Sequence, residues 1–184
     1  GILVDLGYLE TKTYCITNQD HQTKRMNFQA KPIILANSIS EEFDSLRHWM
    51  TPSLLDVLAS NKHQEYPQNI FEAGTVFSED SKTETGVKEQ VRLSVALCQK
   101  DVDYTKIRQV LDLILTFLEV DYKAVREDHS SFIEGRCARI KVKNKGVAYV
   151  GEINPLVLNN FELEMPVAAF ELNLTELFEL VEFN

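Results

Sequence analysis

The stretch Asn69–Cys98, NIFEAGTVFSEDSKTETGVKEQVRLSVALC, is the part of this chain that decides its predicted fold. Its two ends, Asn69–Phe77 and Val91–Cys98, are rich in apolar, β-branched and aromatic residues, which is typical of strands. The 13 residues between them are mostly polar and include Gly86, which favours a loop that closes a long hairpin. Because hairpin strands run antiparallel, the stretch favours an antiparallel or mixed sheet over a doubly wound parallel one.

Strand-like and helical stretches alternate along the rest of the chain. Apolar residues at helical spacing predict a helix over 103–119, which Asp103 can cap, and Thr51-Pro52 predicts the start of a helix over 52–63. Further strands are expected at 9–16, 32–36, 137–142, 147–153 and 166–172, and further helices at 18–26, from Asn154-Pro155 onward and at 175–182. The predicted fold is therefore α/β (α+β), a single domain over residues 1–184 with an antiparallel sheet flanked by helices.

The composition is that of an acidic globular protein. Lys and Arg together number 19 and Asp and Glu together 28, so the formal net charge is −9. This balance argues against nucleic acid or an acidic membrane as the main independent partner, because such binding needs an excess of cations. No apolar run approaches the ~20 residues of a membrane span, and no signal peptide is visible. With three widely spaced cysteines, the sequence predicts a cytoplasmic protein with reduced thiols and no membrane partner.

Basic residues gather in one short segment. Between residues 135 and 151 there is no acidic residue, and positions 139, 141, 143 and 145 are expected to share one face of a strand. This stripe is interpreted either as a phosphate-contacting surface for RNA or as the solvated face of a half-buried strand. The second interpretation is favoured because no aromatic residue interleaves the cations. The cations are Arg136, Arg139, Lys141, Lys143 and Lys145.

No motif for a reaction centre is visible. Asp44 and His48 lie four residues apart, but no nucleophile or oxyanion motif accompanies them. The acidic group of Glu41, Glu42 and Asp44 could hold a hard cation, yet acids at the start of a helix explain it as well. Glycine loops for phosphate and zinc-binding spacings are also absent from the sequence. The residues alone therefore predict no catalytic, cofactor-binding or metal-binding residue.

Four segments follow one another in an order and spacing that are specific when taken together. They are Leu3–Tyr8 (LVDLGY) with the strand after it, Ser45–Phe77 with its ending IFEAGTVF, Ser131–Ala138 (SFIEGRCA) and Val150–Leu172, which begins VGEINP. Together they resemble the C-terminal part of the phenylalanyl-tRNA synthetase beta subunit, of the archaeal and eukaryotic cytosolic type. The resemblance covers nearly the whole chain.

The resemblance implies a class II synthetase-like module that is a fragment of a longer subunit. In this family the beta copy of the module is catalytically silent, and the working site belongs to the alpha subunit. The implied assembly is an alpha2-beta2 heterotetramer that attaches phenylalanine to its tRNA, using ATP and Mg²⁺. The implied partners of this chain are thus the alpha subunit and, through the holoenzyme, tRNA, with no cofactor held by the fragment itself.

The charge pattern of the chain agrees with catalytic silence. Active class II sites are expected to supply an Arg on the hairpin strand and another at the start of the last helix. Here Ile70–Phe77 carries no Lys or Arg, and residues 152–184 hold seven Glu and no Lys or Arg. A triphosphate placed there would meet repulsion. Two alternatives stay open, namely a stand-alone class II-like ligase that uses Arg47, Arg92 or Arg136 on ATP, and an RNA-binding module that uses 136–145.

If the chain performs no chemistry, its function is expected to lie in a contact surface. The helix over 52–63 and the residues before it correspond to the class II region that usually forms subunit contacts. Its apolar residues are interpreted either as an interface with the alpha subunit or as part of this domain's own core. They are Leu46, Trp49, Met50, Leu54 and Leu58.

Overall fold

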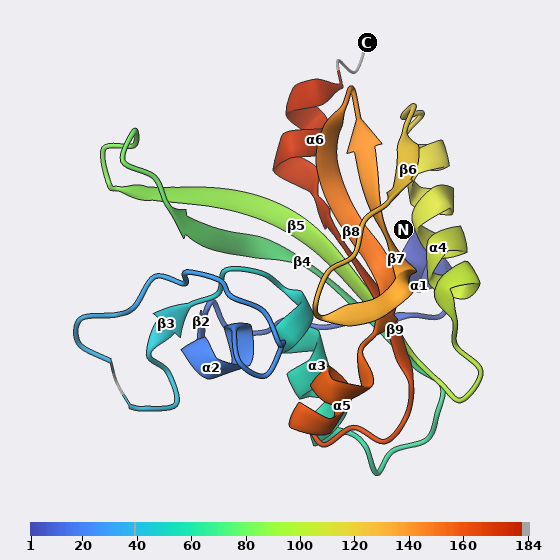
Figure 1. The fold of residues 1–184 in the computed structure, drawn as a ribbon, viewed down its shortest axis with the longest axis horizontal. Coiled ribbons are helices and arrows are strands. Elements are labelled where there is room, and N and C mark those ends of the chain that lie inside the picture. Colours follow the sequence, from blue (N-terminus) through green and yellow to red (C-terminus); the bar gives the residue numbers. More distant parts are fainter. Residues whose placement is uncertain (39, 182–184) are drawn as a thin grey trace.

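The chain folds around one seven-stranded sheet in a computed structural model that describes residues 1–38 and 40–181. All neighbouring strands pair antiparallel except β1 and β4, which are parallel (Figure 1). The predicted antiparallel sheet flanked by helices is therefore confirmed. In spatial order the strands are β1 (Leu9–Glu10), β4 (Gln68–Glu79), β5 (Val87–Cys98), β9 (Val167–Asn173), β8 (Lys145–Ile153), β7 (Phe132–Val142) and β6 (Lys123–Arg126).

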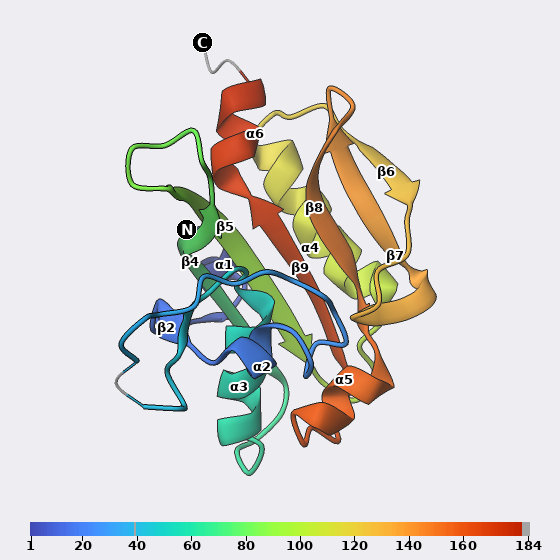
Figure 2. The same ribbon diagram turned by 60° about the vertical axis from the view of Figure 1, so that its left-hand side comes forward.

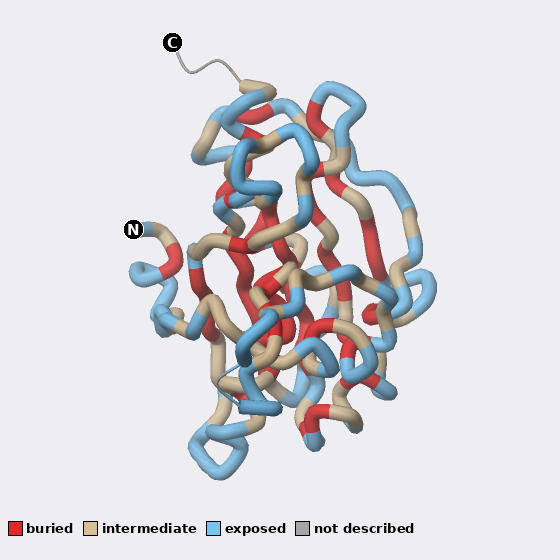
Figure 3. The backbone as a smooth tube through the Cα atoms, turned by 90° about the vertical axis from the view of Figure 1, so that its left-hand side faces the viewer, coloured by how far each residue is buried: buried red, intermediate tan, exposed pale blue. Residues whose placement is uncertain are grey.

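Helices cover both faces of the sheet. The apolar side chains of α1 (Ile2–Asp5), α4 (Tyr104–Phe117) and α6 (Leu174–Leu180) join one core on one face. Those of α3 (Thr51–Ser60) and α5 (Pro155–Asn160) join a second core on the opposite face (Figure 2). Because β9 is buried along its whole length, its alternate residues serve the two cores in turn. Buried backbone follows the central strands, while the connecting loops are exposed (Figure 3).

The hairpin that decided the prediction is longer than expected. Strands β4 and β5 have 12 residues each, pair from Gln68 opposite Cys98 to Glu79 opposite Val87, and leave only residues 80–86 as the loop. Near the tip of the hairpin, apolar and polar residues do not alternate regularly. The sequence pattern therefore did not predict that the outer parts of β4 and β5 are paired. The hairpin projects beyond the body of the molecule (Figure 1).

The N-terminal third holds less regular structure than expected. The strand predicted over 9–16 is split into β1 and β2 (Ile16–Thr17), because Glu72 and the carbonyl of Phe71 bond the residues between them. Helix α2 spans only Gln19–Gln22, and 32–36 forms one bridge, from Ile34 to Ser45 of β3 (Ser45–Leu46). Of the helix predicted over 175–182, residue 182 lies outside the described residues. Within the described ranges no helix is long and apolar enough to cross a membrane.

The apolar residues considered for a subunit interface lie inside the domain. Trp49, Met50, Leu54 and Leu58 are each at most 7% exposed, and Leu46 is half-buried. Three of them belong to the core between α3, α5 and the sheet. These four side chains are buried within this domain, because a helical apolar stripe fits an internal face as well as a partner.

Candidate functional site

A cavity of about 240 Å³ lies on the sheet face opposite α4. Its floor comes from strands β5, β9, β8 and β7, and one wall comes from the segment that leads into α3. Charged, aromatic and small side chains mix in it. The lining residues are Phe28, His48, Trp49, Thr51, Arg92, His129, Phe132, Arg139, Gly146, Val147, Tyr149, Glu171, Asn173 and Glu176.

A buried ion pair fixes Arg47, which begins the segment that leads into α3 (residues 47–51, the wall segment). Arg47 Nη1 lies 3.3 Å from Glu72 Oε2, with both side chains only 4% exposed, and Arg47 Nε donates to the carbonyl of Thr75 at 2.6 Å. Gly74 makes room for this arginine, because a Cβ at position 74 would lie 2.4 Å from Arg47 Nη2. The carboxylate of Glu72 also accepts from the backbone N–H and the hydroxyl of Thr13. Arg47 therefore serves the fold and is not free for a ligand.

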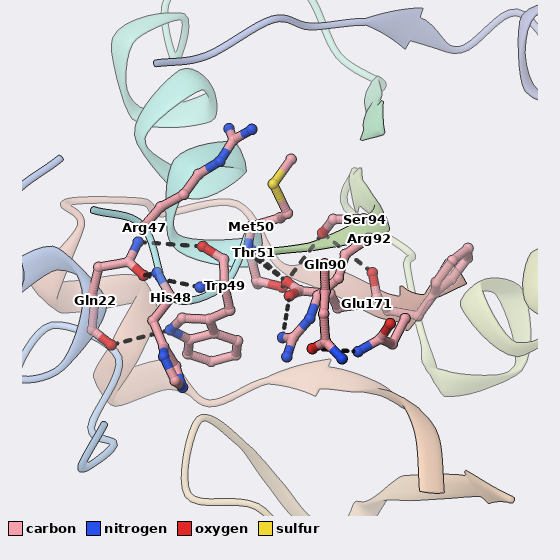
Figure 4. A network of polar contacts seen from close by, with 12 residues as sticks. Gln22, Arg47, His48, Trp49, Met50, Thr51, Gln90, Arg92, Ser94 and Glu171 are labelled. Atoms are coloured by element: carbon pink, nitrogen blue, oxygen red, sulfur yellow. Dashed lines mark hydrogen bonds and ion pairs between the residues drawn. The ribbon is translucent and has the colours of Figure 1, made fainter. Parts of the chain in front are cut away.

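The carboxylate of Glu171 attaches the start of α3 to strand β9. Its Oε1 accepts from the backbone N–H of Met50 at 2.9 Å, and from the N–H and hydroxyl of Thr51 at 2.8 Å each (Figure 4). Its Oε2 lies 2.8 Å from Arg92 Nη1. The first N–H groups of a helix have no partner within the helix, and an acid there is favourable. The side chain of Glu171 thus caps the start of α3, because the N-cap residue Met50 makes no side-chain capping bond.

The fully buried Gln22 fixes the middle of the wall. Its Oε1 accepts from the backbone N–H groups of His48 at 2.7 Å and Trp49 at 3.1 Å. In return, Trp49 Nε1 donates to the carbonyl of Gln22 at 3.1 Å (Figure 4). The wall segment is therefore fixed along its length by the side chains of Arg47, Gln22 and Glu171.

His129 fills the centre of an aromatic cluster beside the cavity. Its ring centroid lies 4.4 Å from that of Phe28, 4.8 Å from Tyr149, 5.5 Å from Phe132 and 5.7 Å from Trp49. Burial, and then the positive charge of Arg139, lower the pKa of His129 to about 4. The imidazole is therefore neutral at pH 7 and packs as an uncharged ring.

We expect acid to weaken this packing. The pKa of His129 is lower in the folded state than its ordinary 6.5, so the unfolded chain binds more protons between about pH 6.5 and 4. Stability should therefore fall by about 2 kcal/mol as pH drops through that range. His129→Phe should remove most of this loss when urea unfolding is followed at pH 7 and pH 4.5. His63→Asn, at an exposed position, serves as the control, and an unchanged slope for His129→Phe would contradict the assignment.

Arg139 packs against Tyr149 in the lining of the cavity. Its Cζ sits 4.1 Å from the ring centroid of Tyr149, and its Nη2 donates to the carbonyl of Gly146 at 3.2 Å. A Cβ at position 146 would lie 2.3 Å from Arg139 Nε, so only glycine accommodates this placement. The hydroxyl of Tyr149 donates to Glu127 at 2.8 Å, and burial together with that bond raises the pKa of Tyr149 to about 12.

Comparison with known proteins identifies the family to which this chain belongs. Residues 1–174 match the family described as Phenylalanyl tRNA synthetase beta chain CLM domain. The chain belongs to this family. Phenylalanine–tRNA ligase beta subunits share 38% identity over 97% of this chain in Pyrococcus abyssi and 37% over 95% in Methanocella arvoryzae. This chain covers 32% of each of those relatives, so it spans about a third of their length.

A solved synthetase shares the fold of this beta-chain domain. A pyrrolysyl tRNA synthetase from Desulfitobacterium hafniense matches it with a TM-score of 0.73. The match covers 94% of this chain and 62% of that one at 16% sequence identity, so it concerns the fold alone. The predicted resemblance to the beta-subunit family is thus confirmed, and the domain shares its fold with a solved tRNA synthetase.

The basic residues that were expected on one face of a single strand lie on two strands and in the turn between them in this beta-chain domain. Strand β7 ends at Val142, Lys143 lies in the following turn at φ 51°, and Lys145 begins β8. Lys145 Nζ lies 4.0 Å from Glu176, and Lys141 stands opposite Lys123 of β6. The expectation for positions 139–145 is therefore wrong in geometry, because a tight turn interrupts the alternation.

Each cation considered for ATP already has an acidic partner. Arg47 pairs with Glu72 at 3.3 Å and Arg92 pairs with Glu171 at 2.8 Å. Arg136 Nη1 pairs with Glu152 at 3.3 Å on the surface, where its side chain is 59% exposed. The sequence could not show these pairs, because the partners lie between 16 and 79 residues apart.

The acidic groupings singled out in the sequence do not form sites. The side chain of Asp44 accepts from the backbone N–H of Gln19 at 2.9 Å and from its amide at 3.1 Å, and it makes no described bond with His48. Burial and the charge of Arg92 lower the pKa of His48. Across residues 1–38 and 40–181, no cluster of three or more His, Cys, Asp or Glu could hold a metal ion.

Proposed function

We propose that this chain is a catalytically silent, synthetase-like domain of a phenylalanine–tRNA ligase beta subunit. Its role is to support the alpha subunit by packing against it, within a cytoplasmic alpha2-beta2 enzyme that charges tRNA with phenylalanine. ATP and Mg²⁺ act at the alpha subunit in this proposal. The observation that carries it is the charge-compensated cavity on the sheet, where a catalytic synthetase would need free cations.

The size of the cavity supports silence. Sites for drug-sized ligands usually measure roughly 300–1,000 Å³, and this cavity measures about 240 Å³. The aromatic cluster around His129 occupies part of the space above the sheet. A nucleoside triphosphate is larger than a cavity of about 240 Å³.

The charges of the cavity support silence as well. Arg92 and Arg139 are its two guanidinium groups, and Glu171 and Glu176 are its two carboxylates, so their formal charges cancel. Stabilising the charge that develops on a phosphate requires an excess of positive charge held in place. Both histidines of the cavity have lowered pKa values and add no charge at pH 7.

Pyrophosphate exchange tests the proposal. We expect the 184-residue chain, mixed with ATP, Mg²⁺ and phenylalanine, to show no exchange above the buffer background. A stoichiometric mixture with an active alpha subunit provides the positive control. Exchange by the chain alone, lost on Arg92→Ala, would instead support the stand-alone ligase.

The N-terminal segment offers an apolar surface for the alpha subunit. Leu9 is 68% exposed and Tyr14 is 80% exposed, and Val4 and Leu6 are about half exposed. Strand β1 lies at the edge of the sheet and pairs over only two residues. Exposed apolar residues beside an open sheet edge are typical of interaction sites. We place the scaffolding contact here, because the apolar side of α3 is buried.

Charge introduced on this surface should weaken the association. We expect the double variant Leu9→Glu, Tyr14→Glu to reduce co-purification with the alpha subunit by at least about tenfold, which corresponds to ~1.4 kcal/mol of binding free energy. Both side chains are exposed, so folding should persist by circular dichroism. Val125→Glu, on the opposite edge strand β6 and 38% exposed, is the matched control. Undiminished association of a folded double variant would refute this placement.

A further inference from the structure

Three lysines without an acidic partner gather around one groove. The groove measures about 820 Å³ and lies where the connection after α4, strand β6, the turn between β7 and β8 and the end of α6 meet. Lys123 of β6, Lys141 of β7 and Lys143 of the turn line it. Glu119 and Asp121 line it from the connection. Among residues 1–38 and 40–181, none of the three lysines forms an ion pair. In a chain of net charge −9, cations therefore outnumber acids at this place.

The lysines of the groove occupy unfavourable positions. Lys123 stands directly opposite Lys141 in the ladder between β6 and β7, and like charges placed in this way destabilise a sheet. Lys143 and Asn144 form the two-residue turn at φ 51° and 64°. Glycine and asparagine adopt this conformation readily, and lysine does not. An anionic group bound in the groove would relieve the repulsion between Lys123 and Lys141.

Strand β6, beside the groove, is an open edge of the sheet. It pairs with β7 on one side and has no strand on the other, so it lies at the margin of the sheet (Figure 2). All four of its residues are exposed. In an antiparallel edge strand, every second residue points its N–H and C=O groups away from the neighbouring strand. In the described part of the chain, those outward groups of β6 bond no other group. They are therefore available to a strand from another protein.

We propose that β6 and the groove dock an extended acidic peptide segment of a partner protein, which adds to the sheet as one more strand. Its backbone would bond the outward groups of β6, and its carboxylates would meet Lys123, Lys141 and Lys143. Lysine on an edge strand discourages pairing with a second copy of the same strand, whereas it attracts an acidic one. The surface lies at the opposite edge of the sheet from β1, where we place the alpha-subunit contact, so it serves a second partner.

A peptide fits this surface better than an RNA strand does. RNA carries a phosphate at every nucleotide, whereas a peptide can place uncharged residues opposite Glu119 and Asp121. Base stacking needs an accessible aromatic ring. Tyr122, the aromatic residue of the groove, is half-buried, and its hydroxyl donates to Asp112. The exposed backbone of β6 can extend a ladder only with another polypeptide.

Fluorescence anisotropy of labelled probes tests the proposal. The probes, titrated with the 184-residue chain, are a peptide of alternating Glu and Val, its counterpart of alternating Lys and Val, the Glu–Val peptide with methylated backbone nitrogens, and oligouridine. We expect saturable binding of the Glu–Val peptide, at least about tenfold tighter than that of the other three. Absence of that binding, or equal binding of the methylated peptide, would overturn strand addition. Tighter binding of oligouridine would show an RNA surface instead.

A matched pair of charge reversals locates the surface. Lys123→Glu should weaken binding of the Glu–Val peptide at least about tenfold. Because this change replaces a like-charge pair with an attractive one, the urea unfolding midpoint should not fall. Lys88→Glu, at an exposed position of β5, makes the same change of net charge and should leave binding unaltered. Equal effects of the two variants would show that the peptide does not bind at β6.

Discussion

Replacing Glu171 with alanine is expected to lower the free energy of unfolding by about 3–5 kcal/mol. The substitution removes the acceptor for the backbone N–H groups of Met50 and Thr51, and it leaves Arg92 without its partner at 2.8 Å. Unsatisfied donors at a buried helix start carry their full desolvation cost. Urea unfolding followed by circular dichroism measures the loss.

Two variants separate the roles of this carboxylate. Glu171→Gln keeps an oxygen acceptor and loses the charge, so it should cost clearly less than Glu171→Ala. Glu152→Ala removes a surface pair with Arg136 and should cost less than about 1 kcal/mol. Equal losses for Glu171→Ala and Glu152→Ala would show that Glu171 does not hold α3 to the sheet.

Replacing Arg47 with methionine is expected to destabilise the chain by a similar amount, about 3–5 kcal/mol. The carboxylate of Glu72 would be left 4% exposed with no cation beside it. The same arginine bonds the carbonyl of Thr75 and the hydroxyl of Thr13, so the N-terminal segment should loosen as well. The unfolding midpoint in urea and amide hydrogen exchange of residues 11–15 report the two effects.

A compensating substitution tests the electrostatic reason for this loss. Adding Glu72→Gln to Arg47→Met removes the unpaired charge and should restore more than half of the lost stability. The surface variant Arg136→Ala is the control, because that side chain is 59% exposed. A double variant that is less stable than Arg47→Met would indicate that packing, not charge, governs the site.

The parts of the fold that depend on local pattern could be predicted from the sequence. Asp103 caps α4 as expected, since its side chain accepts from the N–H of Lys106, and Pro155 stands at the first turn of α5. Strand β6, Lys123–Arg126, was missed because all four of its residues are exposed and it has no apolar alternation. Only its pairing with β7 makes it a strand.

The site itself depends on contacts that no local pattern records. The bonds of Gln22 to the wall segment join residues 26 and 27 positions apart, and Glu171 reaches residues 120 and 121 positions away. Gly74 and Gly146 carried a signal, since each admits a guanidinium where a Cβ would clash. The sequence does not show which arginine side chain packs against each glycine.

The cations of the chain are distributed differently in the structure from what the sequence indicated. The strand segment 70–77 and the last helix lack cations as expected, yet Arg92 and Arg139 do reach the cavity from strands β5 and β7. What distinguishes the cavity is that carboxylates of the chain balance them. The central claim is therefore that this cavity does not accept a nucleotide.

A crystal of the chain soaked with ATP and Mg²⁺ tests that claim most directly. We expect no ordered nucleotide over strands β5, β9 and β8, and we expect the bonds between Arg92 and Glu171 and between Glu171 and the start of α3 to be unchanged. Well-defined triphosphate density against Arg92 or Arg139 would contradict it.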